Sequence, residues 1–247
     1  MSIIHDYTKP GCIHLPLQRN DWTSTACLGI LDNDNNTSPI EKYLHPSELK
    51  HFDTYHYEAR KKSFLSGRYL AKSVLSHFLH EPDLRKIVIR SGIFNQPLLN
   101  YPMPNPPGFS ISHSASFTSC LVFPREHPMA IDIESYNSEA TEAIASQLTE
   151  KEKTLYRSMG LREDIFMLEL WTIKEALSKV LTTGLTAPMH IYEIGEVYKK
   201  GQFHYSTFKN FAQYKAISFN WKRNICSFVL PLKTKCDLDN LIAYINL

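Results

Sequence analysis

The chain of 247 residues lacks the patterns that would assign it to several large protein classes. It has no run of about 18 apolar residues, so we expect no membrane-spanning helix. Its N-terminus has no basic patch followed by an apolar stretch, so we expect no signal peptide. The net charge of +2 lacks the strong basic bias of a nucleic-acid-binding protein. These absences predict a protein that binds neither nucleic acid nor a membrane.

The cysteines also lack a recognisable arrangement. There are five, an odd number, and none forms the CxxC spacing that is typical of zinc sites or redox pairs. This composition favours a reducing cytoplasm.

What the chain does contain is a faint internal repeat. Residues 110–124 and 216–231 each read as an apolar strand, a short polar turn and a second apolar strand that ends in proline. Residues 44–79 and 148–181 each contain a short polar helix followed by a long amphipathic one. The alternative is chance similarity between amphipathic patterns.

If the repeat is real, the chain has an α+β fold built from two similar halves in a pseudo-twofold arrangement. We expect these halves to comprise residues 1–126 and 127–247. Apolar residues at helical spacing predict long helices over 57–79 and 163–181. Alternating residues predict a strand over 129–134.

Asp132 and Glu134 lie two apart in that strand, so both carboxylates face the same way while Ile131 and Ile133 point into the core. Adjacent carboxylates repel each other unless a cation or a proton lies between them. A hard cation such as Mg²⁺ is the natural partner because it takes oxygen ligands and keeps waters for a phosphate substrate. The alternative is a polar strand face at a sheet edge.

The helix that follows carries a second group of candidates. Glu175 and Lys179 are four residues apart and share a face, and Trp171 lies one turn before Glu175. Taken alone, this could be a surface ion pair on an amphipathic helix.

A third candidate is His113, within Ser112-His113-Ser114 at the end of a strand. A histidine there could bind an anion when protonated, or donate from one ring nitrogen when neutral. The alternative is a histidine that is satisfied by the local backbone.

Together and in this order, the motifs resemble the Sfp-type 4′-phosphopantetheinyl transferases. The signature of that family is a G-[IV]-D-[IVL]-E strand followed by a W-x-x-K-E-[AS]-x-x-K helix. Here the strand is 130–134, with Ala130 in place of the usual glycine, and the helix match is 171–179. The family's I-S-H-S matches 111–114, and 60–68 resembles the basic helix ending in G-R of the enterobactin-synthetase type.

The resemblance covers roughly residues 44–185. It implies a site in the cleft between the two halves, where Mg²⁺ would bridge the pyrophosphate of coenzyme A to Asp132 and Glu175, with Glu134 as a third ligand or as the holder of a bound water. Glu175 would take the proton of the attacking serine, and Lys179 would stabilise charge on the bridging oxygen.

The resemblance also implies a set of residues that contact the phosphates of coenzyme A. They are Arg60, Lys61, Arg68, Gln96, Ser112, His113 and Lys179. The family often has G-K-P where this chain has Asn95-Gln96-Pro97, so Gln96 keeps hydrogen-bond donors but loses the charge.

The implied reaction moves the phosphopantetheine arm of coenzyme A to a serine of an apo carrier protein and releases 3′,5′-ADP. The carrier could be an acyl, polyketide or peptidyl carrier, and its docking rim could include Lys151 and Lys153. A two-half chain implies a monomer, since the smaller relatives must pair to build the same cleft.

Two alternatives stay open. One is another metal-dependent phosphotransferase or hydrolase, although the chain has no P-loop, kinase or HExxH pattern. The other is a non-catalytic relative that binds coenzyme A or a carrier protein, which the glutamine at position 96 slightly favours.

Overall fold

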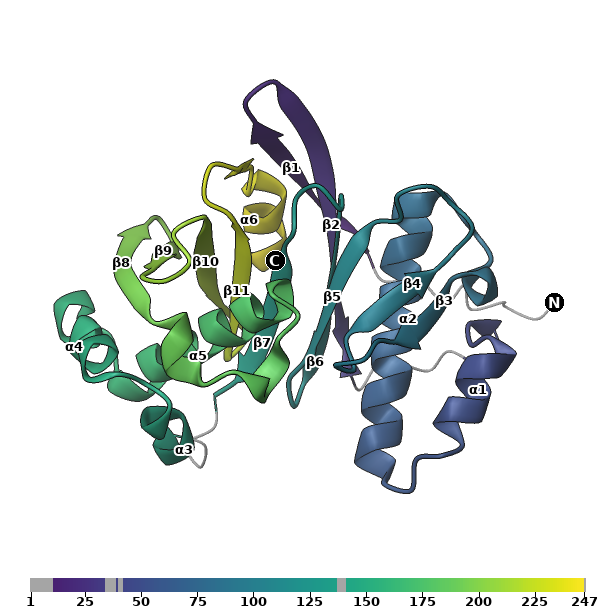
Figure 1. Ribbon diagram of the computed structural model, residues 1–247, viewed down its shortest axis with the longest axis horizontal. Helices are drawn as coiled ribbons and strands as arrows, with labels where there is room; N and C mark the ends of the chain where they lie inside the picture. The colour runs from purple at the N-terminus through teal and green to yellow at the C-terminus, as the bar shows by residue number, and fades with distance from the viewer. Residues whose placement is uncertain (1–10, 34–38, 40–41, 137–140, 247) are drawn as a thin grey trace.

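The structure is a computed structural model and describes residues 11–33, 39, 42–136 and 141–246. It is a mixed α+β fold with two five-stranded antiparallel sheets, each covered by one long helix (Figure 1). The α+β class predicted from the sequence is confirmed. Among the described helices, none combines the length and the apolar composition needed to cross a membrane.

The first sheet has the strand order β12-β1-β2-β6-β5, and α2 packs against β6, β2 and β5. A small separate hairpin, β3–β4, follows α2. The elements of this N-terminal half are β1 (Ile13–Arg19), β2 (Trp22–Asp32), α1 (Pro46–Phe52), α2 (Glu58–Leu79), the 3₁₀ helix η3 (Leu84–Lys86), β3 (Val88–Ser91), β4 (Pro97–Asn100), β5 (Gly108–His113) and β6 (Phe117–Phe123).

The second sheet has the order β7-β11-β10-β9-β8, and α5 packs against β11, β7 and β10. Its elements are β7 (Ala130–Ser135), α3 (Thr141–Ser146), α4 (Glu150–Met159), α5 (Glu163–Val180), η5 (Gly184–Thr186), η6 (Met189–Tyr192), β8 (Ile194–Lys200), β9 (Phe203–Phe208), β10 (Tyr214–Trp221) and β11 (Asn224–Pro231). The chain then adds β12 (Lys235–Cys236) to the edge of the first sheet and ends in α6 (Asp239–Ile245).

Both halves use the same order of elements. A strand (β2 or β7) is followed by a short helix (α1 or α4), a long helix (α2 or α5) and a closing hairpin (β5–β6 or β10–β11). In each sheet the second strand of that hairpin (β6 or β11) lies beside the strand that precedes the short helix (β2 or β7), antiparallel to it. This is the arrangement that the repeated sequence pattern predicts.

A buried ion pair in the N-terminal half shows how closely the repeat is kept. Glu48, in the first turn of α1, accepts a hydrogen bond from the buried ammonium of Lys72 on α2. The same carboxylate accepts from the backbone N–H of His45 at 2.9 Å and of Ile89 at 3.2 Å. Glu48 therefore joins the short helix, the long helix and the following strand.

The C-terminal half repeats this pair roughly one hundred residues later. Glu152 in α4 accepts from Lys174 on α5 at 2.7 Å, and both side chains are fully buried. It also accepts from the backbone N–H of Thr149 at 2.8 Å, within the capping box at the start of α4, and of Ile194 at 2.9 Å. Lys174, which belongs to the W-x-x-K-E motif, therefore has a buried structural partner.

Three buried apolar clusters hold the layers together. One lies between α2 and the first sheet, one between α5 and the second sheet, and the third joins the two sheets and α6. Gly29 in β2 allows α2 to approach closely, because a Cβ there would lie 2.4 Å from Cγ2 of Val74. In Figure 1 the N-terminal half lies to the right with α2, and the C-terminal half to the left with α5.

Candidate active site

Serine side chains join the two halves where β5 and β7 lie side by side. Ser110 Oγ lies 3.3 Å from both the backbone N and the backbone O of Ile131. Ser112 Oγ donates to Asp132 Oδ1 at 2.6 Å and accepts from the N–H of Ile133 at 3.3 Å. Two hydroxyls thus take the role that backbone groups play in a sheet ladder. We call this line of contact the seam.

Asp132 lies at the seam with only 3% of its surface exposed. Its Oδ1 accepts from Ser112 at 2.6 Å and from Lys179 at 2.7 Å. Its Oδ2 is buried and has no hydrogen-bond partner among the described residues. An unsatisfied buried oxygen costs free energy, more so when it carries charge. The position therefore suits a cation that the protein chain does not itself supply.

Lys179 reaches the seam from the last turn of α5. Its Nζ lies 2.7 Å from Asp132 Oδ1, 3.2 Å from the carbonyl O of Ile131 and 3.3 Å from the carbonyl O of Ile111. An ammonium has three N–H donors, so each of them has an acceptor here. A substrate oxygen would have to take the place of one of these acceptors.

Glu134 and Glu175 complete an acidic cluster around Asp132. Burial, followed by the charge of Asp132, raises the pKa of each to about 7. Lys179 lowers both pKa values, and Glu175 adds to the rise at Glu134. Near neutral pH these carboxyl groups are therefore poised between the acid and the anion, and a bound cation would favour the anion.

Two cavities adjoin the cluster. Glu175 and Lys179 line a cleft of about 720 Å³ whose other wall is formed by residues 94–99 and 106–111 of the N-terminal half. Glu134 lines a cavity of about 660 Å³ together with Trp171. Much of the wall of this second cavity is apolar and includes Ile144, Leu168 and Met189. The cluster therefore lies between a cleft that separates the halves and a more apolar hollow.

A smaller basic cavity of about 160 Å³ lies against α2 and is lined by Arg60, Arg68 and His113. The Arg68 guanidinium is held by Glu48, with Nε 3.4 Å from Oε1, and lies 4.7 Å from the ring centre of Phe64. Three nitrogen-bearing side chains facing a hollow of this size suit a phosphate group.

His113 is neutral in this environment. Burial, followed by the charges of Lys179, Arg60 and Arg68, lowers the pKa of His113 to about 4. Its Nδ1 lies 3.1 Å from Thr118 Oγ1, and that hydroxyl donates to Asn33 Oδ1 at 2.6 Å. The hydrogen-bond pattern therefore assigns the ring hydrogen to Nδ1, which leaves Nε2 as an acceptor. An anion in the basic cavity would bind best after Nε2 gains a proton.

The structure thus brings two groups of predicted residues together: Asp132, Glu134, Glu175 and Lys179 in one, and Arg60, Arg68 and His113 in the other. Ser112 turns toward Asp132 and belongs to the first group.

Two of the predicted phosphate contacts have other neighbours. Lys61 pairs with Glu58 on the same helix at 3.1 Å. Gln96 lines the large cleft, but its Oε1 accepts from the N–H of Phe94 at 2.9 Å and so is engaged within the β3–β4 turn.

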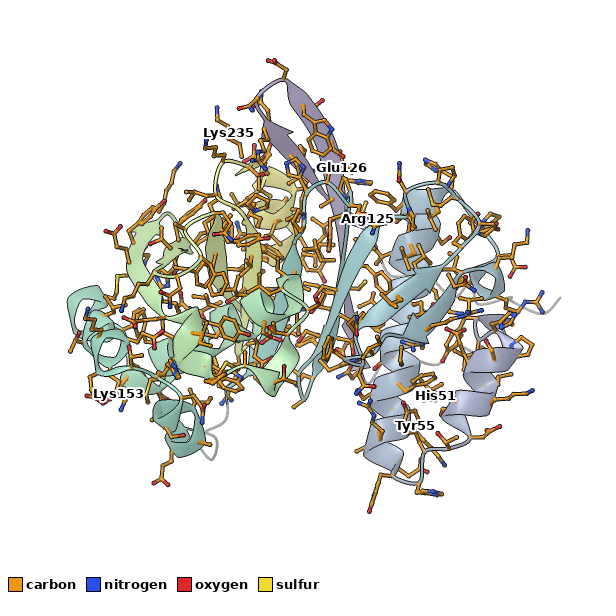
Figure 2. The ribbon with its side chains drawn as sticks, in the orientation of Figure 1. His51, Tyr55, Arg125, Glu126, Lys153 and Lys235 are labelled. Atoms are coloured by element: carbon orange, nitrogen blue, oxygen red, sulfur yellow. The ribbon has the colours of Figure 1, made fainter. Side chains whose placement is uncertain are left out.

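The residues that the sequence analysis missed lie outside the three motifs. Arg125 projects from the β6–β7 connection between the two halves (Figure 2) and lines the large cleft. Ser110 holds the seam but has no distinctive sequence pattern. Arg125 lies between Pro124 and Pro128, in the segment where the two halves meet. That position is the only feature of the sequence that points to Arg125 as a site residue.

Comparisons with known proteins identify relatives of the chain. Residues 128–229 match the sequence model of the 4′-phosphopantetheinyl transferase superfamily. The 4′-phosphopantetheinyl transferase gsp of Aneurinibacillus migulanus is 29% identical over 132 residues, which are 53% of this chain and 52% of that protein. The chain therefore spans about half the length of this curated relative.

Solved structures are similar over part of the chain. A holo-(acyl-carrier-protein) synthase from Bacillus anthracis, in complex with CoA (3′,5′-ADP), is 19% identical with a TM-score of 0.35, and the match covers 45% of this chain and 94% of that one. The Thermotoga maritima holo-[acyl-carrier-protein] synthase is 15% identical with a TM-score of 0.31, over 54% of this chain and 74% of that one.

Proposed function

We propose that the chain is a 4′-phosphopantetheinyl transferase, which transfers the phosphopantetheine arm of coenzyme A to a serine of an apo carrier protein; residues 128–229 match the sequence model of that superfamily. The observation that carries the proposal is the buried, unsatisfied Oδ2 of Asp132. It lies in an acidic cluster with Glu134, Glu175 and Lys179, next to a cleft and near a basic cavity of phosphate size.

The ligand chemistry of the acidic cluster suits a hard divalent cation, which would have to draw its three carboxylates closer together. Asp132, Glu134 and Glu175 supply carboxylate oxygens, which Mg²⁺ prefers, and the adjoining cleft leaves room for waters and phosphate oxygens. When bound there, Mg²⁺ would neutralise charge on the pyrophosphate of coenzyme A and help to orient it. Ser112 and Lys179 hold Asp132 in place from its other oxygen.

The basic cavity would hold the 3′-phosphate of coenzyme A. Arg60 and Arg68 supply permanent positive charge, and the negative phosphate would raise the pKa of His113, which burial first and the neighbouring cations second now lower. Arg125, on the rim of the cleft, is a further candidate for the pyrophosphate. Lys61, paired with Glu58, would contribute less.

In the transfer step the carrier serine Oγ would bond to the β-phosphorus of coenzyme A. The bond from that phosphorus to the bridging oxygen would break, and 3′,5′-ADP would leave with the bonding electron pair. Glu175 would accept the serine proton as the carboxylate, the form that a bound cation favours. Lys179 would donate to the bridging oxygen after releasing one carbonyl acceptor.

The same chain supplies both walls of the cleft, which supports a monomer. All five cysteines are free thiols, as a reducing cytoplasm would keep them. Lys153 lies on α4 at the outer end of the C-terminal half (Figure 2) and pairs with Glu150 at 2.8 Å. An acidic carrier would more readily meet the basic side chains at the cleft, such as Arg125.

The test is the intact mass of an apo carrier protein after incubation with the enzyme, coenzyme A and Mg²⁺. We expect a gain of one phosphopantetheine arm that requires Mg²⁺ and is abolished in Glu175→Ala. The matched control is Glu150→Ala, an exposed glutamate on α4 that should leave the rate unchanged. If acyl, polyketide and peptidyl carriers all stay unmodified while coenzyme A binding is confirmed separately, the chain is a binding protein and the proposal is wrong.

A further inference from the structure

A second cluster of metal-ligating side chains lies on the β1–β2 hairpin, away from the acidic cluster. Cys12 directly precedes β1, His14 lies two residues later, and Cys27 is the residue of β2 that pairs with His14. Residues two apart in a strand and their cross-strand partner share one face of the sheet. All three side chains therefore converge on the face that packs toward α2, where Cys12 and Cys27 belong to the same apolar cluster.

We propose that Cys12, His14 and Cys27 bind one zinc ion through their two Sγ atoms and the histidine Nδ1. These three atoms all lie within 4.8 Å of one another, and the Cys27 Sγ to His14 Nδ1 distance is 3.7 Å. Ligands that bind tetrahedral zinc at 2.0–2.3 Å lie about 3.3–3.8 Å apart. Small side-chain rotations would bring the donors to zinc-binding distance.

The three ligands differ in exposure, which indicates the side from which the ion would enter. Cys27 is buried, Cys12 is half-buried and His14 is exposed. The ion would therefore enter from the side of His14 and be anchored at Cys27. With three protein ligands, the fourth tetrahedral position would face the solvent side and hold water. Such a site would fasten the chain before β1 to the sheet.

The ligand chemistry separates this site from the acidic cluster. Thiolate and imidazole select zinc, whereas carboxylates select Mg²⁺. The zinc ligands all come from the β1–β2 hairpin, while the carboxylates come from β7 and α5. A millimolar excess of Mg²⁺ would occupy the carboxylates without displacing zinc from the thiolates. The two sites can therefore be measured independently.

The test is a zinc titration of tag-free protein against a chromophoric chelator, in excess Mg²⁺ and a non-thiol reductant that prevents a Cys12–Cys27 disulfide. We expect one tightly bound equivalent in the wild type. Cys12→Ser should weaken zinc binding more than about 100-fold, because losing even an outer-shell partner costs about 10–100-fold. His14→Gln should weaken it as well. Cys236→Ser, a half-buried cysteine outside the cluster, should not change it.

Cobalt supplies a readout that does not depend on affinity. Co²⁺ bound at the site should show sulfur-to-cobalt charge-transfer absorption, which carboxylate ligands cannot produce, and Cys12→Ser should reduce it. Zinc at 100 times its Kd should also raise the Tm of the wild type by about 5 °C or more. Equal zinc affinity of wild type and Cys12→Ser, or Co²⁺ binding without that absorption, would overturn the proposal. Cys12→Ser is the variant to compare with the wild type because Cys12 is half-buried. A substitution of Cys27, which is buried, would also disturb the core.

Discussion

Magnesium should stabilise this protein far more at pH 8 than at pH 5.5. The pKa values of Glu134 and Glu175 are each raised to about 7 in the metal-free fold. At pH 8 both are ionised, and the cation binds without displacing protons. At pH 5.5 both are protonated, and each must lose its proton before it can act as a ligand.

The magnitude follows from these pKa values. Below pH 7 the apparent affinity falls about tenfold per pH unit for each displaced proton, so two protons over about 1.5 units cost about a thousandfold. A Mg²⁺ concentration 100 times Kd at pH 8 stabilises by about 2.7 kcal/mol, or about 5–10 °C in Tm for a chain of this size. The same concentration at pH 5.5 would lie below Kd and shift Tm by less than about 1 °C.

The Mg²⁺-induced shift is the quantity to compare, because the metal-free stability has opposing contributions. Glu134 and Glu175 have folded pKa values above their ordinary one, so the stability contribution of both falls as pH rises toward about 7. His113 has a pKa lowered to about 4, so its contribution falls as pH decreases from about 6.5 toward 4. The two trends partly cancel between these pH values.

The assay is thermal unfolding at the two pH values, with and without Mg²⁺, on wild type and Glu175→Gln. The variant loses one ligand and one titrating group, so its Mg²⁺-induced shift should be smaller at pH 8 and vary less with pH. Glu150→Gln, at an exposed position on α4, is the control and should behave as the wild type does. An equal Mg²⁺-induced Tm shift at both pH values in the wild type would refute the reasoning.

Three further predictions follow from single contacts. Asp132→Asn should keep an acceptor for Lys179 and so fold normally, which a circular dichroism melt would check. The same variant should lower kcat by about 100-fold or more in transfer kinetics, because it loses the charge beside the metal. His113→Ala should raise KM for coenzyme A about 10-fold or more with little change in kcat. Dephospho-coenzyme A, which lacks the 3′-phosphate, should have the same KM with the wild type and the variant. Different KM values for that substrate would contradict the assigned contact. Lys174→Met should lower the free energy of unfolding by about 3–5 kcal/mol because it leaves Glu152 buried and unpaired. Lys153→Met on the surface should change it by less than about 0.5 kcal/mol. Denaturant unfolding measures both values, and similar values for the two variants would count against the buried pair.

The helical parts of the candidate site could be predicted because helical periodicity is local. One residue advances about 100° around a helix, so Glu175 and Lys179 share a face whatever the rest of the fold does. The same spacing places Arg60, Gly67 and Arg68 along one side of α2, toward the basic cavity. Lys61 lies seven residues before Arg68 and so near the same side of the helix, and only the structure shows that it pairs with Glu58.

The contacts that cross the seam could not be predicted. Ser112 meets Asp132 and Lys179 meets the carbonyl of Ile111 only because β5 and β7 are adjacent, and no local pattern encodes that adjacency. Burial is equally non-local. The raised pKa of Glu175 and the lowered pKa of His113 depend first on how much protein surrounds them.

The α+β class, the repeated order of elements, the D-x-E strand and the W-x-x-K-E helix could all be predicted from local patterns of residues. Three other features depend on the folded chain: Glu48–Lys72 and Glu152–Lys174 are matching buried pairs, Asp132 keeps one oxygen unsatisfied, and Cys12 and Cys27 meet without any CxxC spacing. The physical reason is the same in each case. Periodicity fixes which side chains share a face, whereas strand pairing and packing fix which faces meet.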